Sequence, residues 1–219
     1  PVCGHAVVEV EGEVALRCPD TWGCRAQLEA AIRHFSSRGA LDIEGLGEKL
    51  VTQLVERGVV RSPADLFGLT AAQLAPLERM AQKSAENLVE ALEAAKAAPL
   101  SRILFGLGIR HVGETVAKKL MRHFGTWDAF AAAVECTGAP EGTSAAADDE
   151  LESVEEIGPI VAASIRAWFA EDRNRELVAE LRGPLGLGGK RERAEVASEG
   201  PFVGKTVVVT GTLETMSRD

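Results

Sequence analysis

A short pattern that occurs four times along the chain constrains its fold more than any other feature of the sequence. The four copies align on Gly47, Ala81, Gly113 and Gly158, and successive anchors lie 34, 32 and 45 residues apart. Small or apolar residues recur four positions before, one before, four after and seven after each anchor. In that order they are Ile43, Leu77, Ile109 and Val154; Leu46, Met80, Val112 and Ile157; Val51, Ala85, Ala117 and Ala162; and Leu54, Leu88, Leu120 and Ile165. Such a repeat indicates that each copy is one supersecondary unit.

Each copy is predicted to form a helix, a tight turn and a second helix. The residues three, four and seven positions after each anchor lie on one helical face, and Ser84 is the one exception to their apolar character. The second helix therefore packs back on the first. The longer third interval contains residues 137–149, which are rich in Gly, Ala, Ser and acidic residues and are interpreted as an inserted loop. The repeat predicts a mainly α fold.

The turn before the first anchor is suited to binding an anion. Gly45 and Gly47 permit a positive φ and a close approach of another molecule to the backbone. Unhindered amide N–H groups at a helix start are partly positive and bind phosphate without a lysine. A repeated turn of this kind suits the phosphates of a DNA backbone, where contacts position a protein but do not read the base sequence.

The net charge of −9 argues against a DNA-binding domain that relies on basic side chains alone. The charge is unevenly distributed. Residues 101–125 contain five basic side chains and one acid, whereas residues 141–156 contain seven acids and no base. The five bases are Arg102, Arg110, Lys118, Lys119 and Arg122. Binding through backbone amides reconciles an acidic chain with an anionic partner.

Nothing in the sequence indicates a membrane span or a secretory signal, so a cytoplasmic protein with no membrane partner is expected. Hydrophobic residues make up 46% and charged residues 26% of the chain, as in globular proteins. Because the chain starts at Pro1 and stops in mid-pattern at Asp219, we expect it to be a fragment of a longer protein.

Three cysteines near the start of the chain, Cys3, Cys18 and Cys24, are predicted to bind a structural zinc ion. They flank two strand-like segments, residues 6–10 and 14–17, and thiols on turns beside a short hairpin can converge on a tetrahedral metal. The fourth ligand is expected just before residue 1; His5 is a less favourable candidate because it lies only two residues from Cys3. The alternative is three ordinary buried thiols. Cys136 is interpreted as a small apolar side chain.

The four units resemble helix-hairpin-helix motifs, and their order after a cysteine cluster resembles bacterial NAD-dependent DNA ligases. The similarity is clearest in residues 38–49 (RGALDIEGLGEK), 83–88 (KSAENL) and 108–113 (GIRHVG). Residues 202–213 (FVGKTVVVTGTL) resemble the start of the BRCT domain of that family. The resemblance implies a partial four-cysteine zinc finger (residues 1–26), a helix-hairpin-helix domain of four repeats (27–182), a linker (183–200) and a truncated α/β BRCT start (201–219), too short to fold alone.

The four turns differ in their suitability for DNA. The second has Arg79 and Ala81 where glycines are expected, and the third has His111 at the first glycine position. The fourth has Glu156 there, which would repel a phosphate unless its side chain turns away. The first and third units are therefore predicted to make the main DNA contacts. The candidate DNA-binding residues are Gly45, Leu46, Gly47, Lys49, Arg110, His111, Gly113, Lys118 and Gly158.

The resemblance implies a C-terminal part of an enzyme that uses NAD and magnesium to seal nicks between a 5′-phosphate and a 3′-hydroxyl in duplex DNA, in replication and repair, and that works as a monomer. The chain contains no Lys-x-Asp-Gly motif and no catalytic residue is assigned, so we expect it to bind DNA without ligating it. The alternatives are a non-enzymatic DNA-binding scaffold, the DNA-binding arm of a repair nuclease, and a helical repeat that binds protein only.

Overall fold

The computed structural model describes residues 2–9, 16–135 and 150–188, and within them the chain is almost entirely helical. The elements are β1 (Val8–Glu9), β2 (Leu16–Arg17), α1 (Arg25–Ser36), α2 (Glu48–Glu56), the 3-10 helix η1 (Pro63–Gly68), α3 (Ala71–Leu74), α4 (Gln82–Ala95), α5 (Leu100–Gly106), α6 (Glu114–Phe124), α7 (Trp127–Glu135), α8 (Pro159–Ala170) and α9 (Asp172–Arg182). The predicted mainly α fold is confirmed. No helix of the described ranges is long and apolar enough to span a membrane.

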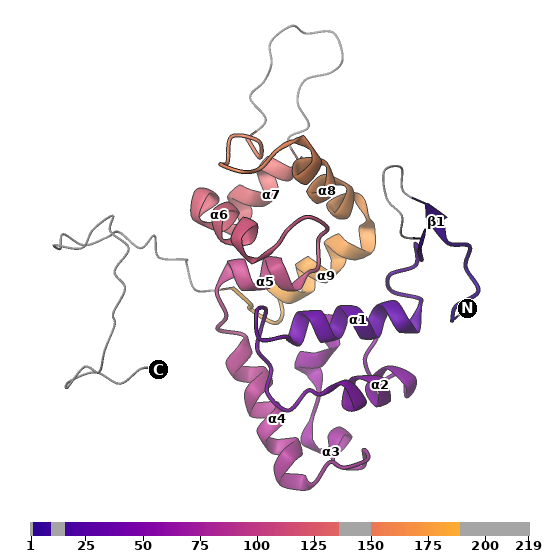
Figure 1. Cartoon of the computed structure of the whole chain (residues 1–219). Helices are drawn as coiled ribbons and strands as arrows, with labels where there is room; N and C mark the ends of the chain where they lie inside the picture. Colours follow the sequence, from indigo (N-terminus) through magenta and orange to yellow (C-terminus); the bar gives the residue numbers. More distant parts are fainter. Residues whose placement is uncertain (1, 10–15, 136–149, 189–219) are drawn as a thin grey trace, which may run out of the picture.

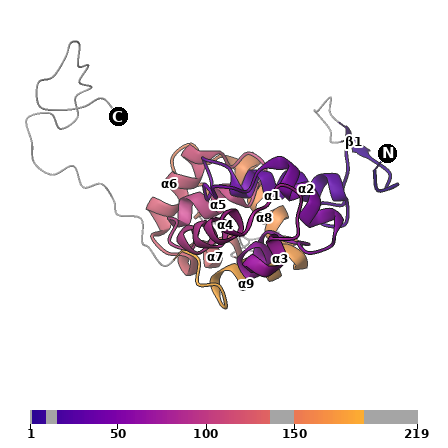
Figure 2. The same cartoon turned by 90° about the horizontal axis from the view of Figure 1, so that it is seen from below.

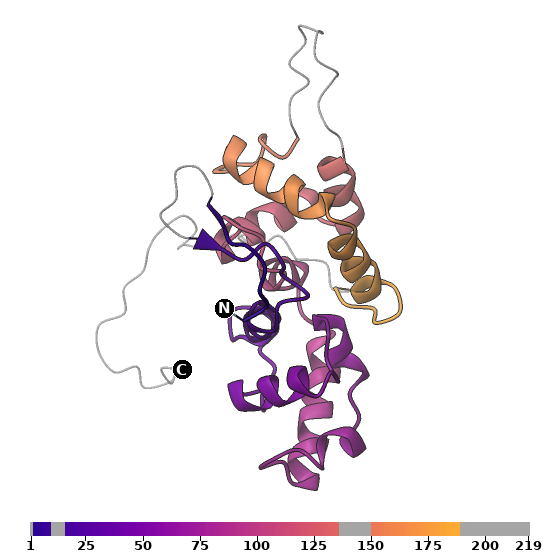
Figure 3. The same cartoon turned by 90° about the vertical axis from the view of Figure 1, so that its right-hand side faces the viewer.

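The helices form two groups, each of which contains two of the predicted units (Figure 1). α1 to α4 occupy the lower half of the view and α5 to α9 the upper half, and Figure 3 shows the same division from the side. Hairpins join α1 to α2, α3 to α4, and α5 to α6, and the fourth turn, at residues 154–157, leads into α8. α1 and α5 pack together across the boundary, where a Cβ on Gly106 would lie 3.1 Å from Phe35.

Within the first group, the two hairpins pack reciprocally. Gln53 of α2 accepts a 2.9 Å hydrogen bond at Oε1 from the amide of Glu78, in the second hairpin. Its Nε2 lies 3.5 Å from the Glu78 carbonyl. In the opposite direction, the Gly45 backbone of the first hairpin packs against Leu88 of α4.

The second group repeats this arrangement with charged residues. Lys119 of α6 stands at the repeat position that Gln53 occupies in α2, and Glu155 stands at the position of Glu78. Lys119 Nζ lies 3.3 Å from Glu155 Oε2 and 2.8 Å from Glu156 Oε1. The third and fourth hairpins are thus joined by the equivalent contact, so the fold consists of two similar pairs of helix-hairpin-helix units.

The repeat pattern forms the core. All sixteen pattern positions are buried except Met80, which is half-buried and packs against the core. Burial of one large aliphatic side chain stabilises a fold by about 1.5–3 kcal/mol, so a pattern repeated four times supplies much of the driving force. The alanines at positions 85, 117 and 162 allow the two helices of each unit to approach closely.

Two of the expected domain boundaries can be located relative to the helices. α1 begins at Arg25, directly after Cys24, so the expected boundary after residue 26 falls inside a helix. At the other end, Leu187 is buried beside Leu100 and Ile103 of α5, and the helical unit therefore continues past residue 182. The predicted inserted loop, Cys136, the rest of the linker and the BRCT-like segment lie outside the described residues.

The segment before α1 stands to one side of the helices, as the view from below shows (Figure 2). β1 and β2 pair in antiparallel register, with Val8 opposite Arg17 and Glu9 opposite Leu16. Both strands lie within the predicted segments, of which residues 10, 14 and 15 are outside the described residues. The chain then turns through residues 18–24 and enters α1.

Candidate nucleic-acid interface and metal centre

All four hairpins have the same backbone turn. In each, the residue two before the anchor has a positive φ, with values of 84° at Gly45, 61° at Arg79, 64° at His111 and 68° at Glu156. In each, the backbone amide of the residue before the anchor donates a hydrogen bond to the carbonyl of the residue four positions before the anchor. The N–O distances are 3.5, 3.2, 3.0 and 3.0 Å in chain order. This is the geometry of a type II turn, which requires a positive φ at its third residue. The turn therefore forms even where no glycine is present.

The second helix of every hairpin begins without a side-chain cap. The anchors Gly47, Ala81, Gly113 and Gly158 are the N-cap residues of α2, α4, α6 and α8, and none makes a side-chain cap hydrogen bond. By contrast, Ser62 and Thr70 form capping boxes at the starts of η1 and α3. The first amides of an α-helix have no partner within the helix. The hairpin helices, like α1, α5 and α9, therefore present first-turn amide donors without a side-chain cap, whereas η1 and α3 satisfy theirs internally.

The anchor glycines are not explained by the fold itself. Gly47, Gly113 and Gly158 have φ values of −77°, −82° and −95°, which any residue adopts. A Cβ at any of these three positions would meet no atom of the described structure within 4 Å. Ala81 occupies the equivalent position of the second hairpin with the same extended backbone. A glycine without an internal reason is expected where an external molecule must approach the backbone closely.

In the first hairpin, the predicted site residues divide into exposed and buried ones. Gly45, Gly47 and Lys49 are exposed, and Lys49 lies in the first turn of α2. The Leu46 side chain is 8% exposed and its amide is used in the turn. Leu46 therefore holds the hairpin on the core.

In the third hairpin, Arg110, His111, Gly113 and Lys118 are all exposed. Lys118 Nζ is 4.0 Å from Glu114 Oε2, a loose contact between exposed groups. The start of α6 also faces the first group, because a Cβ on Gly39 would lie 2.3 Å from Glu114 Oε1. The third hairpin thus lies close to the segment that leads into the first.

The fourth hairpin differs from the other three. Glu156 is turned toward Lys119, whose hydrogen bond to Glu156 raises the pKa of the lysine, so this glutamate does not point freely from the turn. Pro159 at the first position of α8 has no amide proton, which removes one donor. Ile160 follows and is 71% exposed. Gly158 therefore sits in a hairpin with fewer donors and more negative charge than the first or third.

The three predicted zinc ligands converge. The sulfur atoms of Cys3, Cys18 and Cys24 all lie within 4.8 Å of one another, and Cys3 Sγ is 3.5 Å from Cys18 Sγ. Thiolates at about 2.3 Å from a tetrahedral zinc would be separated by about 3.8 Å, so the cluster fits that metal with little movement. Three ligands are present here, and a closed structural site needs a fourth.

His5 and Asp20 surround this cluster. Hydrogen bonds from the backbone and side chain of His5 lower the pKa of the Cys3 thiol to about 6, which favours the thiolate that binds metal. His5 Nδ1 in turn lies 3.5 Å from Asp20 Oδ2. In this arrangement His5 supports Cys3, and the three sulfur atoms alone form the ligand cluster of the described residues.

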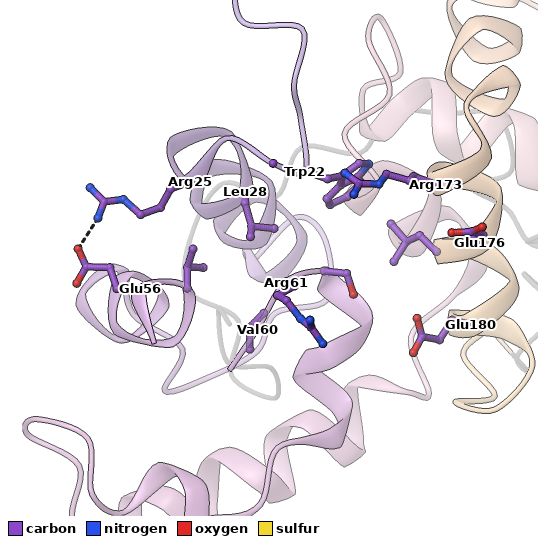
Figure 4. Close-up of a pocket in the computed structure, with 13 residues that line it drawn as sticks. Trp22, Arg25, Leu28, Glu56, Val60, Arg61, Arg173, Glu176 and Glu180 are labelled. Carbon is purple, nitrogen blue, oxygen red and sulfur yellow. Dashed lines mark hydrogen bonds and ion pairs between the residues drawn. The ribbon is translucent and has the colours of Figure 1, made fainter. Parts of the chain in front are cut away.

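Two features were not predicted from the sequence. Trp22 donates a 2.9 Å hydrogen bond from Nε1 to Asn174 Oδ1. Beside it, a pocket of about 690 Å³ lies between α1, α2 and α9. Figure 4 shows its mixed lining, in which Arg25 pairs with Glu56 at 2.8 Å while Arg173 and Glu176 face it from α9. Neither feature carries a periodic signal, so only the three-dimensional structure reveals them.

Comparison with known proteins places these features in a family. Residues 1–26 match the NAD-dependent DNA ligase C4 zinc finger domain, and residues 37–94 match the SAM-like helix-hairpin-helix tandem. Residues 102–136 and 141–178 each match the helix-hairpin-helix motif. Over its whole length the chain is 49% identical to a DNA ligase of Alkalilimnicola ehrlichii, of which it spans 30%.

The fold and the cysteine cluster therefore define a protein with a zinc-finger module followed by tandem helix-hairpin-helix motifs. The order of these modules and the similarity along the whole chain make it a segment of a bacterial DNA ligase. The name of the first match denotes four cysteines, whereas residues 1–26 of this chain contain Cys3, Cys18 and Cys24.

Proposed function

We propose that this chain grips the sugar–phosphate backbone of nicked duplex DNA for an NAD-dependent DNA ligase. The observation that carries the proposal is the presence of glycine at three helix starts where neither backbone conformation nor internal packing requires it. Uncapped amides at these starts supply positive partial charge directed at an anion. Such contacts do not depend on the bases, so the binding is not sequence-specific.

The ligation chemistry belongs to the rest of the parent protein in this proposal. There, a lysine would attack NAD to take up AMP and release nicotinamide mononucleotide, and the AMP would pass to the 5′-phosphate of the nick. The 3′-hydroxyl would then displace AMP, and magnesium would stabilise phosphoryl charge. The chain contributes affinity and orientation as one side of a clamp around the duplex. We further propose that the parent enzyme is monomeric and cytoplasmic and acts in replication and repair. The fourth ligand of its zinc site would be a residue just before Pro1.

Valine substitutions at the anchors test the proposal. Gly47→Val and Gly113→Val are each expected to lower the affinity of the full-length protein for a nicked duplex by about tenfold, because a charge-assisted hydrogen bond is lost and 1.4 kcal/mol corresponds to tenfold. Fluorescence anisotropy with a labelled nicked duplex measures the affinity. Gly68→Val is the matched control, since Gly68 also has open space and no positive φ but lies at the end of η1.

The fold must survive these changes for the test to be valid. The open space around both anchors predicts unchanged thermal unfolding for all three variants. Affinity at the wild-type value for both anchor variants would contradict the proposed role of the hairpins. Equal loss in the Gly68→Val control would show that the effect is not specific to them.

A further inference from the structure

Trp22 links the cysteine cluster to the far end of the described chain. Its indole N–H bonds to Asn174, which is 152 residues later and 6% exposed. The other end of the Asn174 amide, Nδ2, donates a 2.8 Å hydrogen bond to the carbonyl of Trp168. Both polar ends of this buried side chain are therefore satisfied, and Trp22 supplies one of the two partners.

The hydrogen bond that Asn174 donates connects it to α8, the helix that begins at the fourth hairpin. Trp168 lies in the last turn of α8, where carbonyl groups have no partner within the helix. Asn174 binds the carbonyl of Trp168, and Arg175 donates to those of Phe169 and Ala170 at 2.7 and 2.8 Å. Side chains from the first turn of α9 thus fix the end of α8, and the other end of α8 is the Gly158 hairpin.

The turn that carries Trp22 lies between two of the cysteines. The Gly23 amide donates a 2.7 Å hydrogen bond to Asp20 Oδ1, and the Cys24 amide lies 3.3 Å from the Asp20 carbonyl. A Cβ on Gly23 would meet the Asp20 carboxylate, so a larger residue there would have to displace the side chain that holds the Gly23 amide. A metal ion held by Cys18 and Cys24 would fix both ends of the turn. Figure 4 shows Trp22 and Arg173 of α9 among the residues that line the pocket.

We propose that Trp22 is a positioning residue that couples metal occupancy of the cysteine cluster to the rigidity of the fourth hairpin. Metal orders the turn from Asp20 to Cys24, the turn presents the Trp22 N–H to Asn174, and Asn174 fixes the end of α8. Without metal the turn loosens and Asn174 Oδ1 loses its partner. This coupling is independent of the proposed DNA role; only its consequence for DNA binding rests on that role.

Amide hydrogen exchange in the zinc-loaded full-length protein tests the coupling. In the wild type, chelation of zinc is expected to speed exchange in peptides covering residues 159–182 by about tenfold, the size expected when a buried acceptor loses its partner. Trp22→Phe keeps an aromatic ring but removes the N–H. We expect it to speed exchange in the same peptides by about tenfold with zinc bound, and chelation to add less than about twofold more.

Two internal controls separate the coupling from general unfolding. Thr21→Ala changes an exposed neighbour of Trp22 and should respond to chelation as the wild type does. Exchange in α2 should stay constant throughout. Wild-type exchange at residues 159–182 in zinc-loaded Trp22→Phe would overturn the proposal, and so would an undiminished response of that variant to chelation.

Nicked-duplex affinity of the same variants gives a separate result. We expect Trp22→Phe to weaken binding by about 1.5-fold, a small loss because the fourth hairpin is the one expected to contribute least to the affinity. If the wild type fails to bind DNA, the proposed function fails while the exchange data still decide the coupling. Altered exchange with unchanged affinity would overturn the extension of the coupling to DNA binding.

Discussion

Single residues show which features of the hairpins serve the fold and which require another explanation. Arg79, His111 and Glu156 adopt a positive φ without being glycine, so the turn is imposed on them by the buried residues on either side. The sequence predicted glycine-dependent turns and could not predict this, because tertiary packing overrides local preference. The anchor glycines, whose position the sequence did predict, have the opposite character: they are unstrained and unhindered.

Arg79→Gly is therefore expected to stabilise the protein. A left-handed conformation costs a non-glycine residue about 1–2 kcal/mol, and the greater freedom of glycine in the unfolded chain offsets about 0.5–1 kcal/mol of that. The expected net gain is about 0.5–1 kcal/mol in the free energy of unfolding, measured with urea. Arg57→Gly is the control, because Arg57 has a φ of −80° and should lose stability on the same change. Destabilisation by Arg79→Gly would show that the turn is not strained.

At the scale of helices and hairpins, most of the architecture was predictable because it depends on local periodicity. The apolar pattern placed all four turns and the starts of α2, α4, α6 and α8. It did not reveal that α3 has only four residues, nor that α9 caps α8, because neither belongs to the repeat. The pairing of the hairpins could not be predicted either. The residues that make the equivalent contacts are a neutral amide, Gln53, in one pair and a cation, Lys119, in the other.

The hairpins should contribute unequally to DNA binding. Gly158→Val is expected to lower the affinity for a nicked duplex by less than about twofold, compared with about tenfold for Gly47→Val. Pro159 removes a donor from the fourth hairpin, and Glu155 and Glu156 add negative charge there. Anisotropy titrations of both variants under identical salt conditions provide the comparison. Equal losses would mean that all anchor glycines act alike and that the differences in sequence are irrelevant.

The whole molecule combines an acidic charge with a proposed anionic partner. The net charge of −9 would repel DNA at long range, so the contacts must come from backbone amides and a few well-placed cations. The sequence predicted this use of backbone amides by an acidic chain. It could not predict the contact between Trp22 and Asn174, because a single polar pair separated by 152 residues produces no sequence pattern. That contact ties the segment with the cysteine cluster to α8 and α9.

The salt dependence of binding should reveal the cations that touch phosphate. Lys118→Ala is expected to reduce the slope of log affinity against log salt concentration by about 1, as for the loss of one phosphate contact. Its side chain is 53% exposed in the third hairpin unit. Arg57→Ala should leave the slope unchanged, because Arg57 lies at the end of α2 away from its hairpin. An unchanged slope for Lys118→Ala would remove that lysine from the interface.

The most direct test of the central claim is a structure of the full-length protein bound to a nicked duplex. We expect backbone phosphates within hydrogen-bonding distance, about 2.7–3.2 Å, of the amides at the starts of α2 and α6, next to Gly47 and Gly113. We expect no comparable phosphate at the Ala81 hairpin. Phosphates bound elsewhere on the surface, with the Gly47 and Gly113 hairpins facing solvent, would contradict the account.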